Sequence, residues 1–172
     1  MLWRFHLDGA DTGDRFVALA DAWTAADDPR RWYVFNDVHA TMANVGAGRI
    51  AEAEHLVTRL AAYIGADGNG TGAGTNVAMT AEIGLPICRA LVAYGQERWS
   101  RVIEELAPIR RRLQLFGGSH AQRDAWQRTL LEAALRGGEL DLARALIAER
   151  LAVRPTSAYA GAQAKRILSL AS

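Results

Sequence analysis

A short pattern of polar and apolar positions recurs four times along the chain. Each copy has a polar residue or glycine first, a large apolar residue third and a small or apolar residue sixth. This pattern is typical of the bend between two antiparallel helices, because the first residue closes the turn, the third seals it and the sixth lets the helices touch. Repetition of such a helical hairpin predicts an α-solenoid. The four copies are residues 14–19, 48–53, 97–102 and 138–143.

The apolar spacing around these bends predicts the helices themselves. Asp28-Pro29 is expected to break the chain of helices, and the glycine-rich stretch 65–76 (GADGNGTGAGTN) is expected to form a flexible loop. Asn36 and Ser119 are expected N-caps, and Pro86 predicts a kink or a late start because it removes an amide donor. The expected helices are 2–7, 14–25, 36–45, 50–64, 80–94, 99–115, 121–136, 139–151 and 157–170.

The spacing of the sixth positions indicates the kind of repeat. Leu19 and Ala53 are 34 residues apart, which is the period of the tetratricopeptide repeat (TPR). The later steps, to Val102 and Ala143, are 49 and 41 residues, so these hairpins carry insertions. The expected fold is therefore all-α: a single domain over residues 1–172, built as a TPR-like α-α superhelix. We expect a solenoid of antiparallel helix pairs that ends in a C-terminal capping helix.

Three motifs and one longer tract resemble a known family. Residues 35–39 (FNDVH), 84–88 (GLPIC) and 117–124 (GGSHAQRD) look like signature stretches of the tetratricopeptide-repeat-protein-38 family, and residues 132–155 are similar to its last repeat. Members of that family are much longer, so the resemblance implies that this chain is the C-terminal part of such a protein. It also implies a helical-repeat scaffold in the cytosol, and it carries over no catalytic residue.

Charge and cysteine content narrow the classes of partner. The 20 basic and 19 acidic residues nearly cancel, which gives no support for a nucleic-acid or polybasic membrane partner. Arg110, Arg111 and Arg112 are interpreted as a solvated helix end, where cations suit the dipole. Cys88 is the only cysteine, which excludes an internal disulfide and a cysteine cluster for zinc. No apolar stretch approaches about 18 residues, so we expect a cytoplasmic protein with no membrane partner.

The concave groove of the superhelix is the expected binding surface. The residue fourteen positions before each sixth position lies on the first helix of its hairpin and faces this groove, which selects His39, Cys88 and Thr129. We therefore expect an interaction scaffold whose groove binds a protein or a short polar peptide, with no cofactor and no metal ion. The candidate groove and binding residues are His39, Met42, Cys88, His120, Arg123, Asp124, Arg128, Thr129 and Glu132.

An alternative hypothesis is an enzyme, or a binder of a small molecule or metal, that uses His39, Cys88, His120 and Asp124. A histidine beside a cysteine activates the thiol as a nucleophile, and histidines with carboxylates bind metals. A lone cysteine on an apolar helix is more often a small buried hydrophobe. Ser119 and Gln122 predict a capping box, and adjacent Ser, His and Asp cannot form a triad. No catalytic residue is therefore assigned, and convergence of the four side chains around a pocket is the deciding observation.

The first two helices suggest a second kind of partner. Missing upstream repeats would leave an apolar N-terminal helical face, and a terminal repeat without a polar cap tends to pair with another copy of itself. We therefore expect a homodimer in isolation. The residues expected in this face are Leu2, Trp3, Phe5, Phe16 and Trp23.

Overall fold

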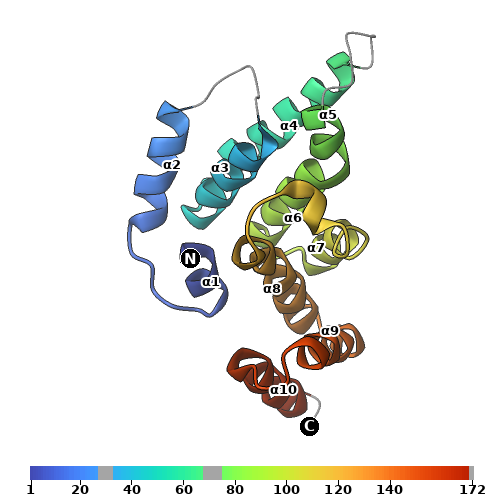
Figure 1. Ribbon diagram of the computed structural model, residues 1–172. Helices are drawn as coiled ribbons and strands as arrows, with labels where there is room; N and C mark the ends of the chain where they lie inside the picture. The colour runs from blue at the N-terminus through green and yellow to red at the C-terminus, as the bar shows by residue number, and fades with distance from the viewer. Residues whose placement is uncertain (27–32, 68–74, 171–172) are drawn as a thin grey trace.

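The computed structural model describes residues 1–26, 33–67 and 75–170. Every regular element in these ranges is a helix, which confirms the all-α prediction. The helices follow a curved path from α2 to α10, and α1 lies on the inner side of the curve beside α3 and α8 (Figure 1). The elements are α1 (Leu2–Leu7), α2 (Arg15–Ala25), α3 (Val34–Gly46), α4 (Ile50–Asp67), α5 (Thr75–Met79), the π-helix η1 (Thr80–Gly84), α6 (Leu85–Gly95), α7 (Trp99–Leu106), the 3₁₀-helix η2 (Leu113–Phe116), α8 (His120–Arg136), α9 (Leu140–Val153) and α10 (Ala158–Leu170).

Three of the four sequence patterns close a helical hairpin, joining α3 to α4, α6 to α7 and α8 to α9. The first residue of each pattern has a left-handed backbone: φ is +74° at Gly48, +58° at Glu97 and +77° at Gly138. The amide of the next residue donates back to a carbonyl in the last turn of the preceding helix, which is the Schellman geometry. These bonds are Arg49 to Asn44 at 2.8 Å, Arg98 to Ala93 at 2.9 Å and Glu139 to Ala134 at 2.8 Å.

The first pattern departs from the other three. Asp14 has a φ of −83° and precedes α2 without closing a hairpin bend. The left-handed residue that ends α1 is Gly9, with φ +74°, and the Ala10 amide donates to the Phe5 carbonyl at 2.9 Å. The turn chemistry is the same, but it lies five residues upstream of the predicted position.

A repeated contact joins each hairpin to the helix before it. The third residue of the pattern lies against a glycine near the end of the first helix of the next hairpin, which allows a close approach of the two helices. A Cβ atom on Gly95 would lie 2.6 Å from Ile50 Cδ1, and one on Gly137 would lie 3.0 Å from Trp99 Cβ. Gly46 faces the ring of Phe16 in the same way. The pairs α2 with α3, α4 with α6 and α7 with α8 are therefore packed through one type of contact.

Two predicted helix starts are wrong for physical reasons. Helix α3 begins at Val34 instead of Asn36, and its first amide is capped by Asn76 Oδ1 at 2.9 Å, from a distant part of the chain. The helix predicted to start at Thr80 starts at Thr75. It runs through the π-helical turn before Pro86, where the wider turn accommodates the missing amide donor.

The hairpin of α6 and α7 has a shorter second helix than predicted. Helix α7 ends at Leu106, and residues 107–112 form turns that lead into η2 instead of completing a helix to residue 115. Arg110, Arg111 and Arg112 therefore do not lie at a helix C-terminus, which corrects the interpretation of their role. They extend from a segment of turns, where Arg110 forms an ion pair with Glu149 and Arg112 one with Glu82.

Helix α6 is the centre of the core. It packs against α3, α4 and α7, and Ile87, Cys88 and Ala90 on it are fully buried. Among the described residues, the helical stretch Thr75–Gly95 is long and apolar enough to cross a membrane by length and composition alone. More than half of that stretch is buried inside the protein, as expected of a central core helix.

Candidate functional site

The predicted groove is occupied by the chain's own first helix. We call the side of α3, α6 and α8 that faces α1 the inner face. Trp3 of α1 is 2% exposed, and its Nε1 donates a hydrogen bond to Thr129 Oγ1 on α8 at 2.9 Å. Its ring lies 5.5 Å from that of Tyr94 and 6.3 Å from that of Phe16. Thr129, a predicted groove residue, is therefore part of the core and does not face an open groove.

Ion pairs also hold α1 against α8. Arg4 lies 3.0 Å from an Asp124 carboxylate oxygen and donates a hydrogen bond to the Ala121 carbonyl. Asp8, just after α1, lies 3.7 Å from the guanidinium of Arg128. Two more predicted binding residues, Asp124 and Arg128, thus contact α1.

The apolar N-terminal face predicted for a homodimer is not exposed as a whole. Trp3 and Phe16 are buried in the core at 2% and 1% exposure, because α1 folds onto the inner face instead of projecting from it. Leu2 and Trp23 are half-buried, and Phe5 is 50% exposed. This corrects the composition of the face, while the homodimer itself stays a prediction.

His39 lies among aromatic rings at the edge of the inner face. Its Nδ1 lies 2.7 Å from the Phe35 carbonyl one helical turn earlier, and its ring centroid lies 4.3 Å from that of Phe35. Trp23 and Trp126 are its next ring neighbours, each at 6.4 Å. Burial lowers the pKa of His39, which the Phe35 carbonyl opposes only in part. Neutral imidazole is therefore favoured at neutral pH, with Nδ1 donating to the carbonyl.

Cys88 and Met42 belong to the core. Cys88 has no exposed surface, and its Sγ accepts a hydrogen bond from Thr41 Oγ1 at 3.4 Å. Met42 is half-buried and packs against the core. A substrate cannot reach the Cys88 thiol in this structure.

Glu132, the last predicted groove residue, joins α8 to α10. It is 5% exposed and accepts hydrogen bonds from Arg136 Nε at 2.7 Å and from Arg166 at 2.6 Å and 3.1 Å. Burial alone would raise the pKa of Glu132, but the hydrogen bonds and charges of Arg166 and Arg136 outweigh it and hold the pKa below its ordinary value. Glu132 is an internal anchor for the C-terminal helix.

The remaining candidates line an open cleft beside α8, with a volume of about 770 Å³. Its walls come from α8, the C-terminal half of α9, the segment before η2 and the start of η2, the turn before α10, Arg4 of α1 and Tyr159 of α10. We call it the arginine cleft, because seven arginines and only two carboxylates line it. The arginines are Arg4, Arg110, Arg111, Arg123, Arg128, Arg150 and Arg154, and the carboxylates are Asp124 and Glu149.

The two carboxylates are shared among several arginines. Asp124 lies 3.0 Å from Arg4, 3.2 Å from Arg128 and 2.6 Å from Arg150. Glu149 accepts two hydrogen bonds from Arg110, one of them at 2.9 Å, and a longer one from Arg111 at 3.4 Å. The hydrogen bond from Arg110 holds the pKa of Glu149 below its ordinary value. Glu149 therefore remains ionised at neutral pH, and arginines outnumber carboxylates in the lining of the cleft.

Two of the arginines are not committed to a carboxylate within the described residues. Arg123 donates to the Gly117 carbonyl at 3.3 Å and to the Gly118 carbonyl, while Arg154 is exposed. Arg128 lies 3.7 Å above the ring of Tyr159, and burial raises the pKa of that phenol to about 12. The cleft therefore presents guanidinium groups to solvent, while ion pairs and the contact of Arg128 with Tyr159 fix other arginines of its lining.

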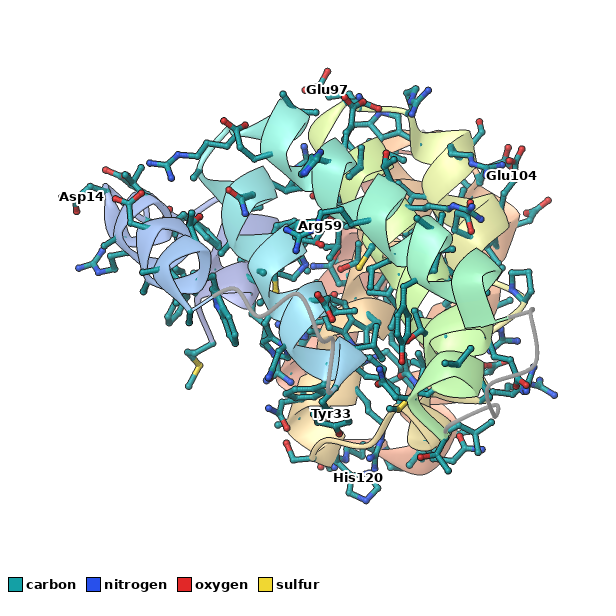
Figure 2. The ribbon with its side chains drawn as sticks, turned by 90° about the horizontal axis from the view of Figure 1, so that it is seen from above. Asp14, Tyr33, Arg59, Glu97, Glu104 and His120 are labelled. Carbon is teal, nitrogen blue, oxygen red and sulfur yellow. The ribbon has the colours of Figure 1, made fainter. Side chains whose placement is uncertain are left out.

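Helix α8 positions its part of the cleft through the predicted capping box, which is confirmed. Ser119 Oγ accepts from the Gln122 amide at 3.2 Å, and Gln122 Oε1 accepts from the Ser119 amide at 2.7 Å. This start directs His120 outward at the margin of the molecule, on the side where Tyr33 lies (Figure 2). His120, Arg123, Asp124 and Arg128 then occupy one side of the helix.

The structure brings four of the nine predicted residues into the cleft, and the other five lie outside it, either buried or half-buried. His120, Arg123, Asp124 and Arg128 line it, whereas His39 and Cys88 are not among its lining residues. The four residues of the enzyme hypothesis therefore do not share this pocket. Among the described residues, no group of three or more His, Cys, Asp or Glu side chains is placed to hold a metal ion.

Sequence reasoning missed the other arginines of the cleft. Arg110 and Arg111 were interpreted as a solvated helix end. Arg150 lies on α9, the second helix of its hairpin, and Arg154 follows that helix, which was not expected to bind. A usable signal was present, because Arg150 lies in the last turn of α9 and Arg154 directly follows the helix, so both arginines belong to the same helix end.

No protein-family model and no solved structure matches the chain. The resemblance to the tetratricopeptide-repeat-protein-38 family therefore stays a prediction from its sequence motifs.

Proposed function

We propose that the protein is a TPR-like helical-repeat scaffold that binds a segment of a partner protein in the arginine cleft. The solenoid part of this proposal is supported by the three hairpins, which share one bend geometry and one type of contact between neighbours. The motifs at 35–39, 84–88 and 117–124 support it too, because the family they resemble implies a helical-repeat scaffold in the cytosol.

The observation that carries the binding proposal is the open cleft of about 770 Å³ on α8. Its volume lies in the range of ligand pockets, about 300–1,000 Å³. The inner face is a poorer candidate for a binding site because α1 covers it. The Trp3 hydrogen bond and the ion pairs of Arg4 and Asp8 hold α1 in that position. The arginine cleft therefore replaces the concave groove as the proposed binding surface.

Site-specific photo-crosslinking tests this proposal. A photoreactive phenylalanine derivative replaces Gln127, an exposed residue of the cleft lining, and in a control chain it replaces Glu52, an exposed residue of α4 outside the cleft. After irradiation in a lysate of the native host, we expect a discrete crosslinked protein from position 127 and none from position 52. The segment that mass spectrometry identifies should then bind the purified chain. Identical labelling from both positions, or none from either, would contradict the proposal.

A further inference from the structure

We infer that the arginine cleft recognises an acidic segment of its partner, in which several Asp or Glu carboxylates lie close together. This inference rests on the proposed function and specifies its ligand. Seven arginines and two carboxylates line the cleft, which leaves an excess of five positive charges in one hollow of about 770 Å³. A concave site lined by one sign of charge focuses its field on ligands of the opposite sign.

The positive charge is concentrated at this place and is not a property of the whole surface. The formal charge of the entire chain is only +1, so the chain outside the cleft is net negative. An acidic ligand is therefore attracted to the cleft and repelled by the rest of the molecule. Such a distribution gives selectivity for one docking position, since like charges elsewhere disfavour other arrangements.

The cleft already binds carboxylates through its own side chains. Glu149 is held by two hydrogen bonds from Arg110, and Asp124 is shared by three arginines. A guanidinium group matches a carboxylate in this two-point geometry, and such charged hydrogen bonds are stronger than neutral ones. Arg111, Arg123 and Arg154 keep donors that these two carboxylates do not occupy, and they are the groups available to a ligand.

A peptide fits this lining better than a nucleic acid does. Tyr159, the large aromatic ring of the lining, is covered by Arg128 at 3.7 Å and approached by Arg150 at 5.1 Å, so its face is not free to stack on a base. Val153, at the edge of the cleft, is 80% exposed. It offers an apolar contact to a side chain between two acidic residues.

Calorimetric titration with a defined acidic peptide tests the inference. The probe is an unlabelled peptide of about eight glutamates, and a peptide of eight lysines is its charge-reversed control, at about 50 mM salt where screening is weak. We expect the chain to bind the glutamate peptide but not the lysine peptide. Raising the salt to about 300 mM should weaken the binding, because screening then acts within a few ångströms of each charge.

The matched variants separate the cleft from the general surface. Arg111→Glu combined with Arg154→Glu reverses two exposed cleft charges, whereas Arg89→Glu reverses an exposed arginine of α6 outside the cleft. We expect the double variant to bind at least about tenfold more weakly and the R89E variant to bind within about twofold of the wild type. Circular dichroism checks that each variant keeps its helix content, and R154E alone replaces the double variant should that one fail to fold.

The outcomes distinguish this inference from the proposed function. If the glutamate peptide does not bind while position 127 still crosslinks a partner, the inference is wrong and the scaffold proposal stands. If neither occurs, both are wrong. Equal weakening by R89E, or tighter binding of a thymidine oligonucleotide of equal charge, also overturns the inference, in the second case in favour of a nucleic acid.

Discussion

At the scale of single residues, Glu132 carries the connection between α8 and α10. Its carboxylate is buried and accepts hydrogen bonds from Arg136 at 2.7 Å and Arg166 at 2.6 Å. Glu132→Gln keeps the shape but removes the charge, so both guanidinium groups lose an ionic partner. We expect the free energy of unfolding to fall by about 2 kcal/mol at pH 7, less than for a fully buried pair because both arginines are partly exposed. Urea unfolding measures this loss.

The same carboxylate gives a pH dependence of defined sign. The pKa of Glu132 is lower in the folded state than in an exposed glutamate. Its contribution to stability is therefore complete above the unfolded pKa, about 4.3, and is lost as the pH falls through the folded pKa. The difference in the free energy of unfolding between the wild type and E132Q should therefore decrease as the pH falls from 5 to strongly acid conditions. Asp141→Asn, which changes a carboxylate on the surface, is the control, and a difference that does not vary with pH would argue against this account.

Thr129 anchors α1, and its hydroxyl can be tested alone. Thr129→Val leaves the buried Trp3 indole N–H without an acceptor, so we expect a loss of about 1–3 kcal/mol in the free energy of unfolding. Thr58→Val is a matched control, because the Thr58 hydroxyl also donates to the carbonyl four residues earlier but is exposed. Its effect should stay within about 0.5 kcal/mol. Equal effects of the two substitutions would show that the Trp3 bond does not stabilise the fold.

At the scale of helical elements, close packing at the glycines determines how neighbouring hairpins approach. Gly95 has an ordinary helical backbone, but a Cβ atom there would lie 2.6 Å from Ile50 Cδ1 and 2.9 Å from Val45 Cγ1. We expect Gly95→Ala to destabilise the protein by about 1–3 kcal/mol through overpacking. Gly65→Ala in α4 meets no atom within 4 Å, so its higher helix propensity should make it neutral or stabilising. Thermal unfolding measures both variants, and the unfolding temperature should fall for G95A but not for G65A. Equal changes in the two unfolding temperatures would show that packing at Gly95 is not tight.

The local elements were predictable from the sequence because their determinants are local. Gly48 and Gly138 close bends that depend only on left-handed residues and neighbouring carbonyls, and the Ser119 capping box involves residues three apart. Long-range contacts were not predictable from these patterns. The cap on Val34 comes from Asn76, and the hydrogen bond of Trp3 reaches Thr129, 126 residues away.

In the candidate site, too, the residues set by local sequence were predictable and those set by long-range contacts were not. His120, Arg123 and Asp124 were identified because they share the first turn of one predicted helix, and Arg128 because it lies on the groove-facing side of that helix. Arg110 escaped notice because its role depends on the early end of α7 and on its pairing with Glu149, 39 residues away. The inner face was mistaken for an open groove because hydrophobic periodicity identifies Trp3 as apolar without showing which surface it covers.

At the scale of the whole molecule, the homodimer prediction now depends on a smaller surface. With Trp3 and Phe16 buried, the exposed apolar side chains of the first two helices are those of Phe5, at 50%, and Val17, at 39%, preceded by Met1. If the chain dimerises through this end, Phe5→Glu should convert it to a monomer, because a charge at the centre of an apolar contact loses its hydration. Leu168→Glu, at an exposed apolar position on α10, should leave the dimer intact.

Light scattering at micromolar concentration measures both variants and the wild type. A wild-type monomer would rule out the homodimer, and α1 would then serve only to cover the inner face of its own chain. A dimer that survives F5E but not L168E would place the interface on the C-terminal helix instead. An interface on α10 would also lie beside the α9–α10 turn, so the arginine cleft would then be a surface shared between two copies.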